Sequence, residues 1–129
     1  MTEAASASSE CVLVVDDESD IRESVRELVE LIGCKALLAA DGREALAVMK
    51  RHRPCLVILD LSMPGMSGLE MLEELKREPQ LSSVPVIIST SSPQRAPPGF
   101  RVVAKPIDID MLCRCIEQSC TCKRKPLSS

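Results

Sequence analysis

Apolar residues along this chain fall into short runs that are separated by segments with helical spacing. Three of these runs, residues 11–15, 55–59 and 84–89, have strand length and little polar alternation. Such runs are typical of parallel strands that are covered on both faces. Weaker runs at 35–39 and 101–104 predict two further strands, and the first of these is expected nearer an edge of the sheet.

Between these strands, apolar residues recur with the period of an amphipathic helix. The first such segment begins at Ser19 and stops at Gly33, a residue that commonly ends helices. Asp41 followed by Glu44 indicates the N-terminus of a second helix. The predicted helices span residues 19–32, 42–53, 69–78 and 108–120.

The alternation of strands with helices predicts an α/β fold, a doubly wound parallel sheet with right-handed crossovers and helices on both faces. A chain of 129 residues is expected to hold one such domain, here placed at residues 10–122. Residues 1–9 are predicted to form a disordered tail, and residues 123–129 a basic C-terminal tail.

Four of the five predicted strands end in polar residues. These are Asp16 and Asp17, Asp60, Thr90 and Lys105. Each alone could cap a turn, but in a doubly wound sheet all of them share the edge where ligands bind. Clustered carboxylates favour a cation, and a set of oxygen ligands favours Mg²⁺ over Zn²⁺. A hydroxyl and an ammonium group beside the ion suit a phosphoryl group, which an aspartate can accept.

Charge and hydropathy narrow the function classes. The formal net charge is −3 without a basic stripe, so nucleic-acid binding by this domain is not expected. The first ten residues do not resemble a secretory signal, and no apolar run approaches the ~18 residues that span a bilayer. A cytoplasmic chain without a membrane partner is therefore expected. The only histidine, His52, lies in a basic cluster and is interpreted as a solvated residue.

The seven cysteines have no obvious common role. Cys11, Cys34 and Cys55 lie in apolar contexts and are expected to be reduced, small hydrophobic residues. Two Cys-x-Cys spacings within residues 113–122 could supply four thiolates to Zn²⁺. However, Cys113 and Cys115 lie two positions apart on a predicted helix and point to different faces, which disfavours a metal or redox role.

The strand-end residues and the loop after Asp60 resemble the receiver domain of two-component response regulators. The matching residues are Asp16-Asp17, Asp60-Leu61-Ser62-Met63-Pro64-Gly65-Met66-Ser67-Gly68, Val86-Ile87-Ile88-Ser89-Thr90 and Lys105-Pro106. The resemblance covers roughly residues 10–120 and implies a flavodoxin-like sheet with strand order 2-1-3-4-5. It also implies signalling by phosphorylation-dependent protein interaction, with no enzymatic role beyond weak self-phosphorylation and self-dephosphorylation.

Roles for individual residues follow from the same resemblance. Asp60 would accept a phosphoryl group from a histidine kinase or a phosphotransfer protein. Thr90 and Lys105 would contact the phosphoryl oxygens, and the peptide bond between Lys105 and Pro106 would be cis. Mg²⁺ would be bound by Asp17, Asp60 and the backbone carbonyl of Ser62, and by Asp16 partly through water.

Two departures from the family pattern concern the fifth strand. Receivers usually carry an aromatic residue three positions before the lysine, where this chain has Val102; its only aromatic residue is Phe100. Residues 91–99 contain three prolines and no apolar period, which disfavours a helix. The fourth helix of the receiver fold is therefore predicted to be missing or reduced to a turn. Because that region usually carries dimerisation and output, partners are expected on another surface, around the first helix.

Two other functions fit part of the pattern. A Mg²⁺-dependent phosphatase with an aspartyl nucleophile would usually carry Asp-x-Asp, whereas Ser62 stands at that offset from Asp60. A pseudo-receiver would bind its partners without phosphorylation. Turnover of a phosphate ester would identify the phosphatase, and resistance to a small phosphodonor would identify the pseudo-receiver.

Overall fold

The sheet has the strand order that the resemblance to receiver domains implied. The computed structural model describes residues 11–61 and 67–119. Its strands pair in parallel in the order β2-β1-β3-β4-β5, and the weakly apolar run forms the edge strand β2, as expected. The strands are β1 (Cys11–Val15), β2 (Lys35–Ala39), β3 (Leu56–Asp60), β4 (Val86–Thr90) and β5 (Arg101–Ala104).

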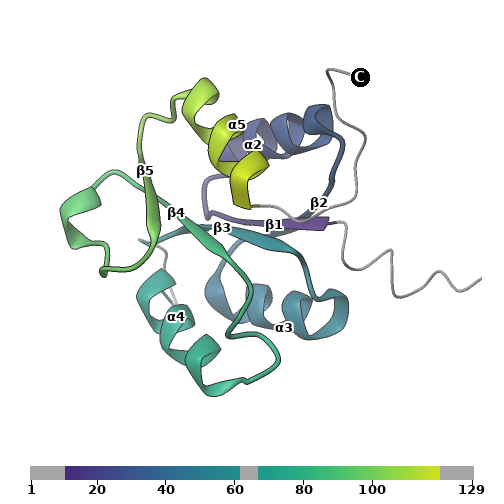
Figure 1. Ribbon diagram of the computed structural model, residues 1–129, viewed down its shortest axis with the longest axis vertical. Coiled ribbons are helices and arrows are strands. Elements are labelled where there is room, and N and C mark those ends of the chain that lie inside the picture. The colour runs from purple at the N-terminus through teal and green to yellow at the C-terminus, as the bar shows by residue number, and fades with distance from the viewer. Residues whose placement is uncertain (1–10, 62–66, 120–129) are drawn as a thin grey trace, which may run out of the picture.

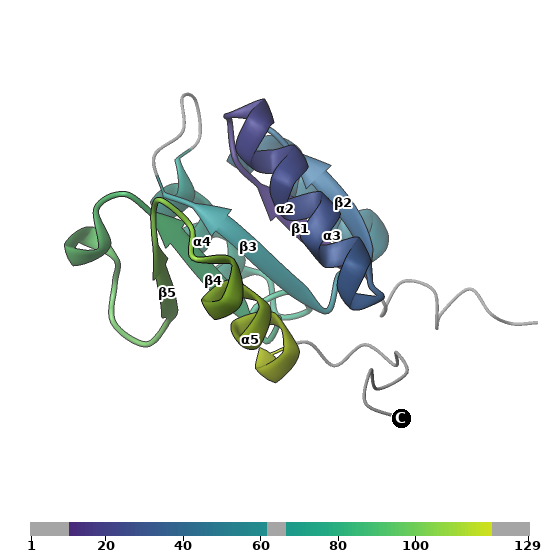
Figure 2. The same cartoon turned by 90° about the horizontal axis from the view of Figure 1, so that it is seen from above.

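Helices cover both faces of the sheet, so that the molecule has three layers (Figures 1 and 2). One face carries α2 (Ser19–Ile32) and α5 (Ile109–Ser119), and the other carries α3 (Gly42–His52) and α4 (Gly68–Arg77). Every residue of β1 and β3 is buried, which explains why these two strands are apolar without alternation. Each described strand and α-helix begins and ends within two residues of its predicted bounds.

Side-chain caps fix the beginnings of two helices. Asp41 accepts a hydrogen bond from the Glu44 amide at 2.8 Å, as its spacing predicted. At the start of α4, the Ser67 hydroxyl accepts from the Glu70 amide at 3.2 Å, and the Glu70 carboxylate accepts from the Ser67 amide at 2.9 Å. This reciprocal capping box holds the chain where it leaves the loop after β3.

The connection between β4 and β5 contains a single 3₁₀ turn, η1 (Pro93–Arg95), and no α-helix. The prediction of a missing or reduced helix is therefore confirmed. Ala96, Phe100 and Val102 pack against the core under α3 and α4. The short connection still returns the chain to a parallel register, so that β5 ends at the same edge of the sheet as β4.

The described cysteines, residues 11, 34, 55, 113 and 115, form no disulfide. Cys11, Cys34 and Cys55 are buried, in agreement with their interpretation as small hydrophobic residues, and Cys115 is buried as well. Burial raises the pKa of the Cys113 thiol, and the carboxylates of Glu117 and Asp110 add to this effect. Cys120 and Cys122 lie outside the described residues, as do both predicted tails. None of the described helices is long and apolar enough to cross a membrane.

Candidate functional site

Three carboxylates meet where the two central strands end. Asp16 and Asp17 directly follow β1, and Asp60 is the last residue of the neighbouring strand β3. Asp16, Asp17 and Asp60 each offer one oxygen, and these oxygens lie within 4.8 Å of one another. Asp16 and Asp60 are buried, whereas Asp17 is exposed. Such a set of hard oxygen donors fits a divalent cation of the Mg²⁺ or Ca²⁺ type.

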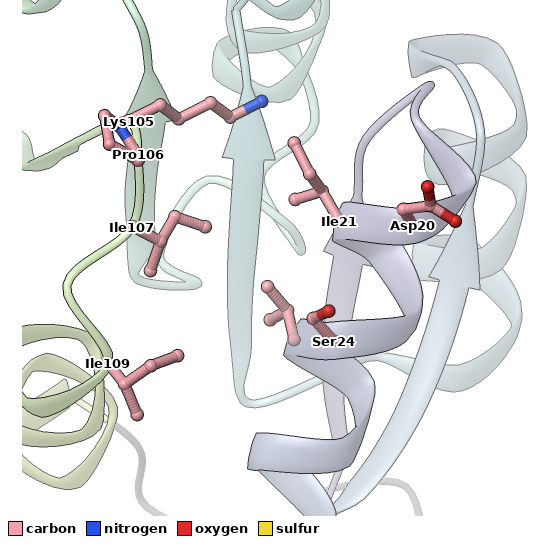
Figure 3. Close-up of a pocket in the computed structure, with 8 residues that line it drawn as sticks. Asp20, Ile21, Ser24, Lys105, Pro106, Ile107 and Ile109 are labelled. Atoms are coloured by element: carbon pink, nitrogen blue, oxygen red, sulfur yellow. The ribbon is translucent and has the colours of Figure 1, made fainter.

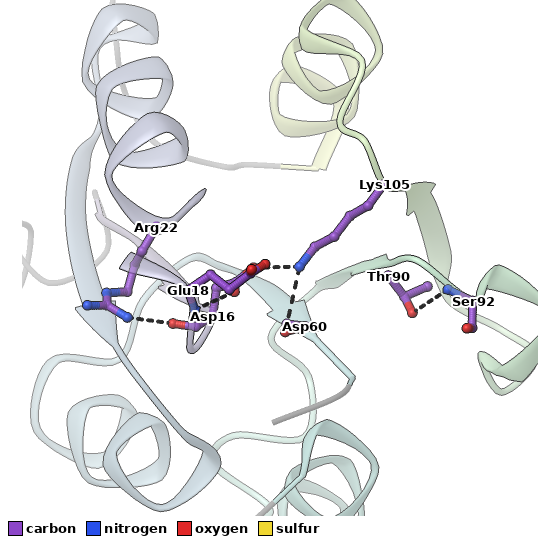
Figure 4. A network of polar contacts seen from close by, with 7 residues as sticks. All are labelled: Asp16, Glu18, Arg22, Asp60, Thr90, Ser92 and Lys105. Carbon is purple, nitrogen blue, oxygen red and sulfur yellow. Dashed lines mark hydrogen bonds and ion pairs between the residues drawn. The ribbon is translucent and has the colours of Figure 1, made fainter. Parts of the chain in front are cut away.

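The two oxygens of the Asp16 carboxylate already have partners within the protein (Figure 4). Oδ1 accepts a hydrogen bond from the Glu18 amide at 2.9 Å, and Oδ2 accepts one from Lys105 Nζ at 2.9 Å. Arg22 fixes the same residue from another side, because its guanidinium donates to the Asp16 carbonyl at 2.7 Å. Asp16 is thus held rigidly, while the exposed Asp17 faces the solvent side of the cluster.

Lys105 supplies the positive charge of the site. Its Nζ lies 2.9 Å from Asp16 Oδ2 and 3.6 Å from Asp60 Oδ2. Desolvation lowers the pKa of Lys105, but the hydrogen bond to Asp16 and the charges of Asp16, Asp60 and Glu18 outweigh it and raise the pKa above its ordinary value. The stabilisation that the protonated Lys105 contributes is therefore present below its ordinary pKa of ~10 and is lost as the pH rises through the raised pKa.

Thr90 is the last residue of β4. This strand pairs with the Asp60 strand β3 on the side opposite β1. It is 1% exposed, and its hydroxyl oxygen accepts a hydrogen bond from the Ser92 amide at 3.0 Å (Figure 4). The hydroxyl proton is left for donation to a further acceptor. The Thr90 carbonyl accepts from the Lys105 amide at 2.8 Å, which joins the ends of β4 and β5. The remaining predicted site residue, Ser62, lies outside the described residues.

A cavity of about 520 Å³ opens over these strand ends. Asp17, Asp60 and Lys105 line it together with Pro106, which belongs to the matching Lys105-Pro106 pair. Three further lining residues, which the sequence interpretation did not assign to the site, are Glu18, Ile21 and Ser91. Glu18 could have been found, because it continues the acidic run Asp16-Asp17. The contribution of Ile21 and Ser91 depends on how α2 and the β4–β5 connection fold over the edge.

A second cavity, of about 320 Å³, adjoins the first between the N-terminal turns of α2 and the connection from β5 to α5 (Figure 3). Lys105 and Pro106 line both cavities. Ile21 and Ile107 face each other across this second cavity, and the exposed Ile109 lies further along it. The peptide bond between Lys105 and Pro106 is cis, as the resemblance implied.

Comparisons with known proteins agree with this geometry. The protein-family model for the response regulator receiver domain matches residues 12–117 of this chain. The probable transcriptional regulator ycf27 of Porphyridium aerugineum is 44% identical over 82 residues, which are 64% of this chain and 33% of that protein. The chain spans about a third of the length of this and similar curated relatives.

Two solved structures cover nearly all of the described fold. The response regulator protein TrrA from Thermotoga maritima, in complex with Mg(2+)-BeF, is 32% identical with a TM-score of 0.75. The chemotaxis response regulator CheY4 of Vibrio cholerae is 29% identical with a TM-score of 0.77. Each comparison covers 84% of this chain and 97% of the other chain.

Proposed function

The chain belongs to the family of response regulator receiver domains, and from this premise we propose that Asp60 accepts a phosphoryl group from a histidine kinase or a phosphotransfer protein. The observation that carries the proposal is the position of Asp60. It lies at the end of β3, buried among two further carboxylates and one lysine, and it lines an open cavity. A carboxylate in this position is reachable by a donor and surrounded by groups that suit a phosphoryl group.

The transfer itself needs little acid–base chemistry from the protein. An oxygen of Asp60 bonds to the phosphorus, the bond from phosphorus to the donor histidine nitrogen breaks, and its electron pair returns to the imidazole. Lys105 Nζ, 3.6 Å from Asp60 Oδ2, provides a positive charge where the phosphoryl oxygens arrive. The Thr90 hydroxyl proton is available to one of these oxygens.

The carboxylate cluster fits Mg²⁺, which would neutralise charge on the phosphoryl group when bound. Asp17 and Asp60 are the residues that would bind it directly, with the Ser62 carbonyl. Asp16 would act partly through water, because both of its carboxylate oxygens already accept hydrogen bonds within the protein.

The apolar cavity beside the site supports a protein as the phosphodonor. Ile21, Ile107 and Ile109 offer an apolar surface next to Lys105, where a helix that presents a phosphohistidine would rest. We propose that the domain then signals through a changed protein surface and is not a turnover enzyme.

Intact mass spectrometry tests this function. We expect the wild-type chain, incubated with a small phosphodonor and Mg²⁺, to gain the mass of one phosphoryl group. The label should be lost with hydroxylamine, which cleaves acyl phosphates, and should not form when Mg²⁺ is chelated. An unlabelled wild type would favour a pseudo-receiver, and steady turnover of a phosphate ester would favour a phosphatase.

Replacing Asp17 tests the metal site. We expect Asp17→Ala to bind Mg²⁺ at least about tenfold more weakly by calorimetry, because a direct carboxylate ligand and its charge are both lost. Asp17 is exposed, so the fold should be retained. Asp20→Ala is the matched control, since Asp20 is also exposed but lies outside the carboxylate cluster. An unchanged Mg²⁺ isotherm in Asp17→Ala would defeat the assignment.

Replacing Lys105 separates the metal site from the phosphoryl site. Lys105→Ala should bind Mg²⁺ at least as tightly as the wild type, because the ammonium group competes for the Asp16 and Asp60 carboxylates. Its phosphorylation by a small donor should be about tenfold slower, because the transition state loses the free energy of one charge-assisted hydrogen bond. Lys50→Ala, at an exposed lysine of α3, should match the wild type in both assays. A fall in Mg²⁺ affinity as large as that of Asp17→Ala would reverse these roles.

The missing helix leads to a prediction about output. We expect no dimer that depends on phosphorylation through the face of β5 and α5, since the helix beside it is reduced to η1 and Val102 replaces the aromatic switch residue. Sedimentation of the phosphorylated and unphosphorylated chain measures this. A phosphorylation-dependent dimer that is lost in Arg101→Glu or Arg114→Glu would contradict it, because both residues are exposed on that face.

A further inference from the structure

The hydroxyl of Ser89 is a buried polar group that the function described above does not use. Ser89 is 2% exposed. Among the described residues, its Oγ is the one buried side-chain oxygen or nitrogen without a hydrogen-bond partner. Leaving such a group unpaired costs about 1–3 kcal/mol, a cost that an apolar residue would avoid. An unpaired hydroxyl on a buried strand therefore calls for an explanation.

The strand register places this hydroxyl beside the predicted phosphoacceptor. β3 and β4 are parallel, and Asp60 pairs with Ser89. Two residues earlier, Ile58 and Ile87 both belong to the core under α2 and α5. Because side chains alternate along a strand, Asp60 and Ser89 lie on that same face. Neighbouring strands are about 4.8 Å apart, so rotation of the serine side chain can bring Oγ within hydrogen-bond reach of the Asp60 carboxylate.

The ion pair between Lys105 and Asp60 describes the site before a phosphoryl group is present. Lys105 Nζ lies 3.6 Å from Asp60 Oδ2 and offsets the charge of that carboxylate. When a phosphoryl group is present, its oxygens attract the ammonium group instead. The ammonium group then no longer offsets the negative charge that returns to the Asp60 carboxyl group when the phosphoryl group leaves.

We propose that Ser89 is a positioning residue that donates a hydrogen bond to the Asp60 carboxyl group as the phosphoryl group is hydrolysed from it. This inference rests on the proposed function of Asp60. In the hydrolysis, the oxygen of a water molecule bonds to phosphorus, and the bond between phosphorus and the Asp60 oxygen breaks. The electron pair of that bond returns to the carboxylate, and both water protons leave on inorganic phosphate. Ser89 stabilises the developing carboxylate charge, so it shortens the lifetime of the phosphorylated state.

The decay of the phosphorylated protein tests this role. After labelling with a small phosphodonor and removal of the donor, intact mass gives the rate of loss of the phosphoryl group. We expect Ser89→Ala and Ser89→Cys to decay about fivefold to tenfold more slowly than the wild type, because neither retains an O–H donor and a tenfold change corresponds to about 1.4 kcal/mol. Ser89→Thr retains the hydroxyl and should decay close to the wild-type rate.

The set of variants separates a hydrogen bond from a packing effect. Urea unfolding checks that each variant is folded. Ser89→Cys is included because cysteine nearly preserves the shape of serine, whereas the added methyl group of Ser89→Thr could be too large for the site. Decay of the Ala and Cys variants at the wild-type rate would overturn the proposal. Equal slowing in all three variants, threonine included, would assign Ser89 to packing and overturn it as well. Failure of the proposed function would be observed differently, because the wild type itself would then gain no phosphoryl group. The role proposed for Ser89 would be overturned by that result as well.

Discussion

Asp60→Asn is expected to take up no phosphoryl group from a small phosphodonor under conditions that label the wild type. An amide of nearly the same shape keeps the packing at the end of β3 but lacks the nucleophilic carboxylate. The site offers Asp60 as a buried carboxylate that lines the cavity, with Lys105 at 3.6 Å. Asp16 is buried with both oxygens occupied by hydrogen bonds, so it should not take over the reaction.

Intact mass measures this result, and peptide mapping locates any residual label. Asp110→Asn is the matched control, because Asp110 is exposed in the first turn of α5, outside the carboxylate cluster. It should be labelled like the wild type. Persistence of a single hydroxylamine-sensitive label in Asp60→Asn would place the phosphoacceptor elsewhere.

The same variant should be more stable than the wild type when Mg²⁺ is absent. One oxygen of Asp60 lies within 4.8 Å of an oxygen of each of the two other carboxylates, and Lys105 lies closer to Asp16 than to Asp60. Removing one negative charge relieves more repulsion than it loses in attraction, by about 1 kcal/mol. Urea unfolding with and without Mg²⁺ measures this difference, which should shrink when the ion is added.

The position of the site could be predicted from the sequence because it depends on topology. Continuous apolar runs indicate parallel strands, and parallel strands joined by helices bring their carboxyl ends to one edge. The strand ends that carry Asp16, Asp60, Thr90 and Lys105 therefore lie at one edge of the sheet. The loss of a helix after β4 was predictable for a local reason, since prolines at 93, 97 and 98 remove amide donors that a helix requires.

The distribution of contacts within the site could not be predicted in this way. That the Lys105 ammonium is 2.9 Å from Asp16 but 3.6 Å from Asp60 depends on side-chain rotamers, which the pattern does not encode. The unpaired hydroxyl of Ser89 emerged only from the pairing of β3 with β4, because a shift of one residue would turn it to the other face.

The return of the chain after β3 depends on close approach at Gly68, the first residue of α4. Its amide donates to the Leu61 carbonyl at 3.1 Å. A Cβ at this position would overlap the Asp60 carbonyl oxygen and would lie 2.7 Å from the Leu61 Cα, both of them backbone atoms. Neither can move aside without shifting the end of β3, where the predicted phosphoacceptor is placed.

Gly68→Ala is therefore expected to lower the free energy of unfolding by about 3 kcal/mol, the upper range for forcing an extra methyl group into a packed site. It should also weaken Mg²⁺ binding, because the clash is with the backbone of Asp60. Urea unfolding and calorimetry measure the two effects. Gly99→Ala is the matched control, because its added Cβ meets nothing within 4 Å and its φ of +92° is the only source of strain. Its cost should be about 1 kcal/mol with Mg²⁺ affinity unchanged. Equal losses in the two variants would show that close packing of α4 against the end of β3 does not hold the site in place.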